Sequence, residues 1–506
     1  MHWIAVRVPR TAVCVIDPGS HFMQSWSART DALEISQLRS PAFAHPMAYE
    51  PTALLDFAIR EGRTSELIDA PVQVTIGQRQ CTWIPTTDLS AQASMLKAIP
   101  SNKLFLDFCS SLEDKLPHRW LSGTATSVSK DLITGDFHVH YRTTVGQQDL
   151  KVVSPAVILA TGPVGKWNVP SPFEPHLASG LIVHTEELLA GHKGTLSEEI
   201  TRRCLDDCAR VLIIGGGLSA AQAALAALRA GYQVVLRSRR PLQTRAFDIG
   251  TEWFDVRTAD RLRFEFLCLP MKNRRKAIRD ATTGGSVPAH YMEEIHRLSQ
   301  ASSGLQLEVD EEIDGSQVCV DSAHEHVFVN GDAFAMVILA TGVVTEPSCS
   351  PLYRSVEELL QAPTVDGLPC VDSRLRWVPS KNLFVLGANA VLELGPGGGN
   401  LMGAMRGARV VSNELHGFVW RHLNGRKAGP PRSVFSNMYA SLGDRERFGD
   451  GSEEELDVLA QRLHLSPQAE TALRKVRKTK KATKGLKSGR VPCAGLNARE
   501  RRATYC

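Results

Sequence analysis

Three small residues, Gly215, Gly217 and Ala220, occupy the positions of a G-x-G-x-x-G/A turn. In such a turn the first glycine allows a tight bend and the second lets a diphosphate approach the backbone; the third small residue lets a helix pack closely on the sheet. An aliphatic run, 211–214, precedes the turn, and an alanine-rich segment, 219–230, follows it. Because the glycines lie between a strand and a helix, the sequence predicts a dinucleotide site. A glycine loop that only packs two elements is the alternative.

The strand after this helix is followed by arginines rather than by a carboxylate. Arg237, Arg239 and Arg240 stand there, and the next acidic residue is Asp248. A carboxylate would bind the ribose hydroxyls of NAD, whereas arginines accommodate the 2′-phosphate of NADP. The sequence therefore favours NADPH over NADH. A solvent-exposed turn is the alternative for some of these arginines.

Two apolar segments of similar sequence flank this pattern, at residues 152–165 and 333–344. Each contains an aliphatic run that ends in Ala-Thr-Gly. The candidate residues at these strand ends are Thr161, Gly162, Thr341 and Gly342. One such tripeptide carries no information, but paired copies occur in flavoproteins with two dinucleotide-binding domains, where they connect one domain to the other.

A further glycine-rich turn follows near residue 390. Residues 381–390 predict a strand that runs into a turn at Gly387, and residues 395–399 are Gly-Pro-Gly-Gly-Gly. Asn400 and Leu401 then lead into a helix rich in small residues. A strand, a glycine turn and a helix N-terminus offer backbone amides to an anion. A helix entered through a flexible loop is the alternative.

With these elements the chain resembles the flavoproteins that have two dinucleotide-binding domains, in particular the flavin-dependent lysine and ornithine N-hydroxylases. The resemblance covers about residues 12–415. Besides the motifs above, it is carried by Asp17 after an apolar strand, Trp26 in a predicted loop, residues 38–41 (LRSP), residues 57–63 (FAIREGR), and His184 with Thr185. His184 is similar to a histidine that this family carries between its FAD and NADPH elements. A structural loop histidine is the alternative.

The chain departs from the family at its beginning. In the family a first G-x-G-x-x-G holds the FAD diphosphate, about 20 residues before the acid that binds the adenosine ribose. Asp17 resembles that acid, but no glycine precedes it. We expect either that the sequence starts at an internal methionine of a longer protein, which the later elements favour, or that the FAD phosphate site is lost. Ala388 also replaces an aspartate usual in the family, so flavin contacts there would come from backbone amides.

The order of motifs predicts an α/β protein with two Rossmann-like, doubly wound domains. A chain of 506 residues is too long for one hydrophobic core. We expect an NADPH domain inserted in an FAD domain that lacks its first βα unit. The predicted boundaries are 1–203 for the first part of the FAD domain, 204–340 for the NADPH domain, 341–418 for the second part of the FAD domain, and 419–506 for a C-terminal extension.

Charge is distributed unevenly. Residues 471–506 contain twelve Lys or Arg and one acid, although the formal net charge of the chain is only +4. This tail is predicted to be disordered, and its charge alone would attract nucleic acid, an anionic membrane or an import receptor. The tail has little aromatic content and the chain has no recognisable nucleic-acid-binding fold, so we expect no specific nucleic-acid recognition. Residues 272–276 (KNRRK) predict a solvated loop, with a phosphate or substrate contact as the alternative.

The 11 cysteines are scattered, and none forms a C-x-x-C motif. Cys204 and Cys208 are the closest pair, without a nearby histidine to complete a metal site. We expect reduced thiols, a cytoplasmic location and no metal. No apolar run approaches the ~20 residues that cross a bilayer.

The resemblance implies an NADPH-dependent flavoprotein oxidoreductase, most like a monooxygenase, in which a flavin hydroperoxide oxygenates a small nucleophilic substrate. The alternatives are a reductase that passes electrons to a quinone or protein acceptor, and a non-catalytic redox-responsive regulator that has lost FAD. No catalytic residue, substrate or oligomeric state is predicted. The candidate FAD and NADPH residues are Asp17, Trp26, Thr161, Gly162, His184, Gly215, Gly217, Ser219, Ala220, Arg237, Arg239, Arg240, Thr341, Gly342, Gly387, Asn400 and Leu401.

Overall fold

The computed structural model describes most of the chain up to residue 424. The described residues are 13–68, 72–76, 79–83, 98–116, 118–189, 194–203, 210–253, 256–282, 285–301, 304–309, 318–321, 326–378 and 381–424. The predicted basic tail and the Cys204 and Cys208 pair lie outside them. No helix in these ranges is long and apolar enough to cross a bilayer.

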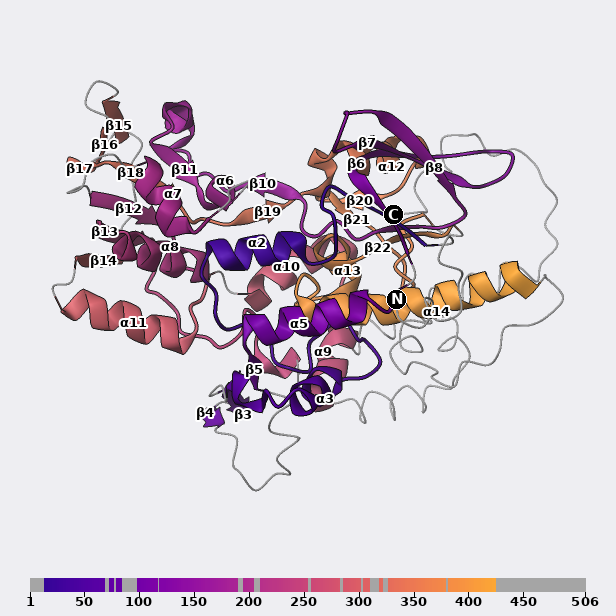
Figure 1. The fold of residues 1–506 in the computed structure, drawn as a ribbon, viewed down its shortest axis with the longest axis horizontal. Coiled ribbons are helices and arrows are strands. Elements are labelled where there is room, and N and C mark those ends of the chain that lie inside the picture. The colour runs from indigo at the N-terminus through magenta and orange to yellow at the C-terminus, as the bar shows by residue number, and fades with distance from the viewer. Residues whose placement is uncertain are drawn as a thin grey trace, which may run out of the picture.

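One half of the molecule is built on a five-stranded parallel sheet, at the left of Figure 1. Its strands, in spatial order, are β11 (Ile182–His184), β18 (Met336–Leu339), β12 (Arg210–Ile214), β13 (Gln233–Ser238) and β14 (Leu305–Val309). Every neighbouring pair is parallel. Strands covered on both faces read as continuous aliphatic runs, as the central strand β12 does. We call this sheet, with the elements packed on it, the parallel-sheet half.

The two faces of this sheet are covered differently. Helices α8 (Leu218–Arg229) and α11 (Ala289–Gln300) pack on one face through alanines, Met292 and Ile295. A small antiparallel sheet covers the other, made of β15 (Val318–Asp321), β16 (His326–Val329) and β17 (Asp332–Phe334). The parallel strands therefore lie between two apolar layers, and only their carboxyl ends are free to present turns to a ligand.

The second half, at the right of Figure 1, is built on two separate sheets. The first has the order β1 (Cys14–Asp17), β6 (Arg119–Lys130), β7 (Phe137–Thr143) and β8 (Asp149–Ser154), and β1 is parallel to β6. The second consists of β9 (Val157–Leu159) parallel to β22 (Leu383–Val385). Within the described ranges, no strand pairs with the second edge of β1 or of β9. We call this region the split-sheet half.

A single apolar core nevertheless joins the two sheets of the split-sheet half. It contains Val128 and Phe137 from the first sheet, Leu383 from the second, and Trp377, which is 1% exposed. Helix α12 (Pro351–Leu360) lies on β6 and contributes Tyr353 to this core. Side-chain packing therefore holds this half together where the hydrogen-bonded ladder is interrupted.

A helical layer lies beside these sheets. Its helices are α2 (Gln24–Ala32), α3 (Ala53–Arg60), α5 (Asn102–Glu113), α9 (Val256–Cys268), α10 (Met271–Thr282), α13 (Val391–Leu394) and α14 (Leu401–Asn424). Ser101 caps α5, since its side chain accepts a hydrogen bond from the amide of Leu104. Leu54, Phe57 and Phe105 form the core between α3 and α5.

Two expectations about this layer are wrong. The predicted loop around Trp26 is helix α2, where the indole packs on Phe105 at 5.6 Å between ring centroids. The predicted solvated loop at residues 272–276 belongs to helix α10. Arg274 in that helix is 2% exposed and pairs with Glu393 at 3.1 Å. The charge of Arg274 is therefore paired inside the protein and is not presented to solvent.

The remaining elements are short. The helices are α6 (Thr185–Leu189) and α7 (Leu196–Arg203). The strands are β2 (Leu67–Ile68), β3 (Val72–Ile76), β4 (Arg79–Trp83), β5 (Ile99–Pro100), β20 (Thr364–Val365) and β21 (Leu368–Pro369). None of these strands pairs with a strand of the main sheets.

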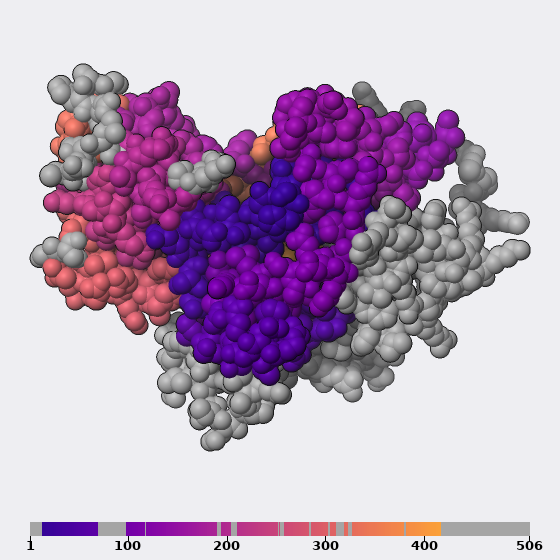
Figure 2. All heavy atoms as spheres, in the orientation of Figure 1, coloured from indigo at the N-terminus to yellow at the C-terminus, as the bar shows by residue number. Residues whose placement is uncertain are grey.

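A two-stranded ribbon connects the halves. Strand β10 (Gly165–Trp167) is antiparallel to β19 (Val343–Thr345), and each follows one of the Ala-Thr-Gly tripeptides. Figure 1 places the ribbon between the two halves, as the repeated tripeptides predict. In Figure 2 the same face has a notch between the two lobes, and the indigo N-terminal segment lies below it.

Candidate functional site

The predicted dinucleotide turn joins β12 to α8, and its first glycine leaves no room for a side chain. Gly215 has a φ angle of +154°. A Cβ atom at this position would lie 2.4 Å from the carbonyl oxygen of Ala340, at the end of β18. The amide of Gly215 donates a 3.0 Å hydrogen bond to the carbonyl of Arg237 on β13. The turn is therefore fixed between the ends of both strands that neighbour β12.

The N-terminus of α8 begins immediately after this turn. Gly217 is the N-cap, and no described side chain caps the helix. Ser219 is exposed, while Ala220 is 1% exposed and packs into the core, the close approach of helix and sheet expected there. The four predicted residues of the turn thus meet at the carboxyl end of β12. The free amides and the dipole of α8 favour an anion at this point.

A second backbone segment lies on the turn. We call residues 285–287 the cover segment. A Cβ atom built on Gly285 would be 2.8 Å from the Cα of Gly217, so the two glycines are in direct contact. Two backbone hydrogen bonds, of 2.8 and 3.0 Å, join the cover segment to residues 243–245. The cover segment is therefore joined to residues 243–245 on one side of the turn.

The three predicted coenzyme arginines have different surroundings. Arg237 lies within β13, is 4% exposed, and its Nε donates to Glu308 on β14 at 2.6 Å. Arg239 and Arg240 follow the strand and are exposed. The hydroxyl of Ser238 donates to the carbonyl of Arg240 at 2.8 Å, which fixes the turn. Only the two exposed arginines have guanidinium groups free to approach a phosphate from solvent.

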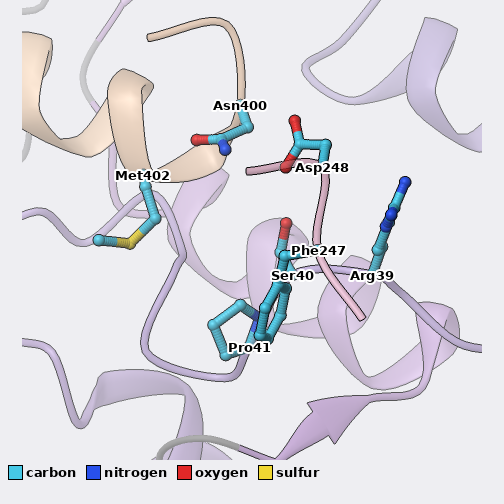
Figure 3. Close-up of a pocket in the computed structure, with 7 residues that line it drawn as sticks. All are labelled: Arg39, Ser40, Pro41, Phe247, Asp248, Asn400 and Met402. Atoms are coloured by element: carbon cyan, nitrogen blue, oxygen red, sulfur yellow. The ribbon is translucent and has the colours of Figure 1, made fainter. Parts of the chain in front are cut away.

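A cavity of about 170 Å³ lies where three segments meet. It is lined by Arg39, Ser40, Pro41, Phe247, Asp248, Asn400 and Met402. Figure 3 shows the carboxylate of Asp248 directed toward Asn400, whose amide turns away from it toward the start of α14, with Ser40 and Phe247 below. The lining comes from the N-terminal segment, from the loop after β13 and from the beginning of α14. The cavity therefore lies between the parallel-sheet half and the elements that pack with the split-sheet half.

Sequence reasoning named only Asn400 among these lining residues as a site residue. Residues 38–41 were noted for the family resemblance and Asp248 as the first acid after β13, but neither signal assigned them to one cavity. Their meeting depends on the packing of segments more than 150 residues apart. In the sequence, the signal for these loops is weak: Ser40 stands beside Pro41, and Asp248 beside Phe247.

The predicted C-terminal glycine turn is tightly packed. Gly395 and Gly397 have φ angles of +78° and +77°. The side-chain oxygen of Asn400 accepts a 3.2 Å hydrogen bond from the amide of Gly403 and so caps α14. Leu401 packs against two neighbouring cores of the helical layer. The N-terminus of α14 therefore faces the cavity, and Asn400, the residue before the helix, is part of the lining.

The first Ala-Thr-Gly tripeptide is tied to the turn after β22. Asn389 lies in the 3-10 helix η7 (Gly387–Ala390) and is fully buried. Its Nδ2 donates to the carbonyl of Gly162 at 2.8 Å and to the hydroxyl of Tyr353 at 2.7 Å. That hydroxyl lies 2.9 Å from the hydroxyl of Thr161. Asn389 thus joins the ends of β9 and β22, a role that sequence reasoning missed.

The second tripeptide is tied to the ribbon and to His184. The imidazole of His184 is fully buried, and its Nε2 lies 3.2 Å from the carbonyl oxygen of Gly342. Its Nδ1 accepts a hydrogen bond from the amide of Glu186, so Nε2 carries the proton. Burial lowers the pKa of His184, and the ring stacks on Trp167 at 5.4 Å. Thr341 donates from its hydroxyl to the carbonyl of Asn168. His184 does not line the cavity.

The two N-terminal candidates lie apart from the cavity lining. Asp17 ends β1, and its carboxylate accepts a 2.7 Å hydrogen bond from the amide of Gly19. Trp26 donates from its indole to Asn102 on α5 at 3.2 Å. Asp17 remains half-exposed at the carboxyl end of a parallel strand, where a ribose hydroxyl would be accepted. Trp26 serves the helical layer.

Two of the comparisons with known proteins give no match. No family model matches the chain, and no curated protein is similar to it in sequence. Solved structures, however, share its fold. The FAD-bound cadaverine monooxygenase DfoA from Erwinia amylovora has a TM-score of 0.56 at 17% identity, over 79% of this chain and 88% of its own.

Two ornithine hydroxylases give similar results. The reduced form of PvdA from Pseudomonas aeruginosa has a TM-score of 0.54 at 15% identity, over 81% of this chain and 91% of its own. The Kutzneria ornithine N-hydroxylase KtzI, with reduced FAD, NADP⁺ and L-ornithine, has a TM-score of 0.52 at 14% identity, over 80% of this chain and 98% of its own. The chain therefore shares the α/β fold of these monooxygenases. The predicted fold class and family resemblance are confirmed at the level of fold.

Proposed function

We propose that the protein is an NADPH-dependent flavoprotein oxidoreductase of the monooxygenase type, acting on a small nucleophilic amine. One observation carries this proposal: a single cavity is lined by the loop that follows the nucleotide-binding βαβ unit and by the helix N-terminus of the other half. Hydride transfer needs a nicotinamide and a flavin in contact, and residues of both halves converge at this cavity.

The residues around Gly215 fit a dinucleotide. The turn has the glycine geometry, the uncapped helix and the exposed arginines that a diphosphate and a 2′-phosphate need. We propose that Gly217 and Ser219 bind the diphosphate through backbone amides. Arg239 and Arg240 bind the 2′-phosphate, while Arg237 maintains the sheet through Glu308.

The residues of the other half fit FAD at its two ends. Asp17 would accept the adenosine ribose hydroxyls, and the turn before α14, with Asn400 and Leu401, would hold the flavin end. Thr161 and Gly162 are exposed beside it at the end of β9. For the FAD diphosphate, no described strand pairs with the second edge of β1 or of β9, where a strand carrying a glycine turn would stand. When bound, the flavin supplies electron transfer from NADPH and activation of oxygen.

The cavity lining offers one carboxylate to a cationic substrate. Asp248 is the acidic residue of the lining; the charge of Arg39 lies near it, but the Arg39 guanidinium donates to backbone carbonyls. Asp248 would hold an ammonium group, and Asn400 would orient a neighbouring polar atom. Phe247 and Met402 would exclude water. The three solved relatives carry amine substrates in their names, cadaverine or ornithine, which supports the same chemistry here.

A second candidate is a regulator that binds NADPH but not FAD. The open edges of β1 and β9 favour it, because the FAD diphosphate would need a cradle at that place. Two measurements on the full chain separate the candidates: the flavin released on denaturation after incubation with FAD, and NADPH-dependent oxygen consumption with cadaverine or L-ornithine. The proposed enzyme retains flavin and consumes oxygen in step with hydroxylated amine. A chain that binds NADPH and refuses FAD is the regulator.

A reductase would oxidise NADPH only with an added quinone or protein acceptor. That outcome would replace the monooxygenase proposal. We also propose a cytoplasmic location, supported by the free thiols of Cys14, Cys109 and Cys349. The size of the cavity supports a small-molecule partner.

A further inference from the structure

Arg39 connects the two halves of the molecule beside the cavity. It stands in the N-terminal segment between α2 and α3, and its side chain reaches the loop after β13 and the cover segment. The two regions that it contacts lie more than 200 residues later in the chain.

The guanidinium of Arg39 donates four hydrogen bonds to the parallel-sheet half. Its Nε donates to the carbonyl of Ala246 at 3.0 Å, and its Nη2 to the carbonyl of Arg245 at 3.2 Å. Nη2 also donates to the hydroxyl of Ser286 at 2.7 Å, and Nη1 to the carbonyl of Ser286 at 3.4 Å. A planar guanidinium with donors in a fixed fork sets the relative position of all the carbonyls that it binds.

These partners lie at both functional features of the parallel-sheet half. Ala246 is followed directly by Phe247 and Asp248, which line the cavity. Ser286 is 3% exposed and follows Gly285, which rests on the dinucleotide turn at Gly217. The two segments are themselves joined by backbone hydrogen bonds. A displacement at Arg39 therefore moves the cavity wall and the cover of the turn together.

Resting on the proposed function, we infer that Arg39 is a positioning residue for hydride transfer. It fixes the position of the nucleotide-binding half relative to the cavity. The nicotinamide of a coenzyme whose diphosphate binds at the Gly215 turn would then meet the flavin end. Arg39 acts through carbonyls of the protein rather than through the coenzyme. Its loss should consequently change the rate of hydride transfer much more than the affinity for NADPH. A misplacement of about 1 Å in such a geometry costs about 100-fold in rate.

The variants R39Q, R39K and S286A test this inference on the full chain loaded with FAD. We expect the rate constant of flavin reduction at saturating NADPH to fall about 100-fold in R39Q. The Kd for NADPH should stay within about threefold, and reoxidation of the chemically reduced protein by oxygen should not change. R39K keeps the charge but loses the fork and should recover part of the rate, while S286A should lie between R39K and the wild type.

A matched control is R29Q. Arg29 also lies in the N-terminal region and forms an ion pair with Glu186 at 2.5 Å, but its side chain is 47% exposed and does not line the cavity. We expect R29Q to change flavin reduction by less than about twofold, as exposed ion pairs contribute little. Thermal unfolding of all variants would show that each is folded.

Hydrogen exchange gives a readout that needs no cofactor. The amides of Arg245 and Val287 donate the two hydrogen bonds that join the loop to the cover segment. Without ligand, R39Q should exchange both amides about tenfold faster than the wild type, and R29Q should not. Unchanged exchange in R39Q overturns the inference even if the wild type binds no FAD, a result that separately counts against the proposed function.

Two kinetic results would also overturn it. One is flavin reduction in R39Q within threefold of the wild type at saturating NADPH. The other is an affinity loss of tenfold or more with an unchanged limiting rate, which would make Arg39 a binding residue for the coenzyme.

Discussion

The parallel-sheet half and the split-sheet half differ in what holds their strands in place. In the first, β12 is paired on both sides and its terminal turn is fixed by Ala340 and by the carbonyl of Arg237. In the second, β1 and β9 are each paired on one side within the described residues, and a core around Trp377 holds the sheets together. A dinucleotide turn needs backbone fixed on both sides. In the proposed function, the NADPH site would therefore be formed by the backbone of one half, whereas the FAD site in the other would depend on side chains that are distant in the sequence.

The largest expected effect comes from Gly215, where the parallel-sheet half has no room for a side chain. In Gly215→Ala the new Cβ would meet the carbonyl of Ala340 at 2.4 Å, at a φ that side chains avoid. We expect the turn to be displaced, at a cost of about 3 kcal/mol in NADPH binding, or about 100-fold in Kd. Calorimetric titration with NADPH measures it.

Gly231→Ala is the matched control for that variant. Gly231 ends α8 with a φ of +91°, and nothing lies within 4 Å of a Cβ built there. We expect a stability loss of about 1 kcal/mol from backbone strain and an unchanged Kd. Equal losses of NADPH affinity in the two variants would contradict the steric account of the turn.

In the split-sheet half, the corresponding fixed point is a side chain. Asn389→Ala removes the donor to the carbonyl of Gly162 and to the buried hydroxyl of Tyr353. We expect the free energy of unfolding to fall by about 2–3 kcal/mol, with NADPH binding unchanged. Urea denaturation with calorimetry on the same samples measures both. A loss of NADPH affinity with full stability would show that the halves are not independent.

The low pKa of one histidine gives the helical layer a pH dependence of its own, since His45 packs on Phe108 of α5 and Met405 of α14. His45 is 1% exposed, and burial lowers its pKa to about 4. Between that value and the ordinary 6.5, the unfolded chain binds a proton that the folded chain refuses, so stability is lost as the pH falls. From pH 7 to pH 5 we expect a loss of about 2 kcal/mol from this group.

Denaturant unfolding of the wild type and of His45→Asn at several pH values tests this. The variant should be less stable at pH 7. Its free energy of unfolding should fall less steeply toward pH 5, because about one proton fewer is taken up on unfolding. Parallel curves for the two proteins would contradict the buried neutral imidazole.

The smallest effect is expected at the exposed arginines. Arg239→Ala with Arg240→Ala should weaken NADPH binding by about tenfold, because two charge-assisted contacts to the 2′-phosphate are lost. NADH lacks that phosphate and serves as the control ligand, whose Kd should not change. An equal loss for both coenzymes would mean that these arginines act on the turn and not on the phosphate.

Local patterns made the parallel-sheet half largely predictable from sequence. The spacing of Gly215 and Ala220 indicates the turn, although the carbonyl that excludes a side chain at Gly215 belongs to Ala340, far later in the chain. Arg237 is different: its partner Glu308 lies 71 residues later, and the ion pair that buries it has no local signature. The role of Arg39 was invisible for the same reason, since its acceptors lie 206 to 247 residues away.

The helical layer was the least predictable part. Helix α2 contains six polar residues among nine, and only Thr30 and Ala32 are buried, so no apolar stripe distinguishes it from a loop. Helix α10 has a basic sequence whose buried member, Arg274, is compensated by Glu393 from another helix. Tertiary partners of this kind convert a sequence that reads as solvated loop into part of the fold.

The account depends most directly on the binding of a nicotinamide coenzyme at the end of β12. Isothermal titration of NADPH into the folded, full-length chain tests it without any requirement for flavin. We predict saturable binding of one NADPH per chain, weaker binding of NADH, and loss of the signal in Gly215→Ala. A folded chain that binds neither coenzyme would contradict the account.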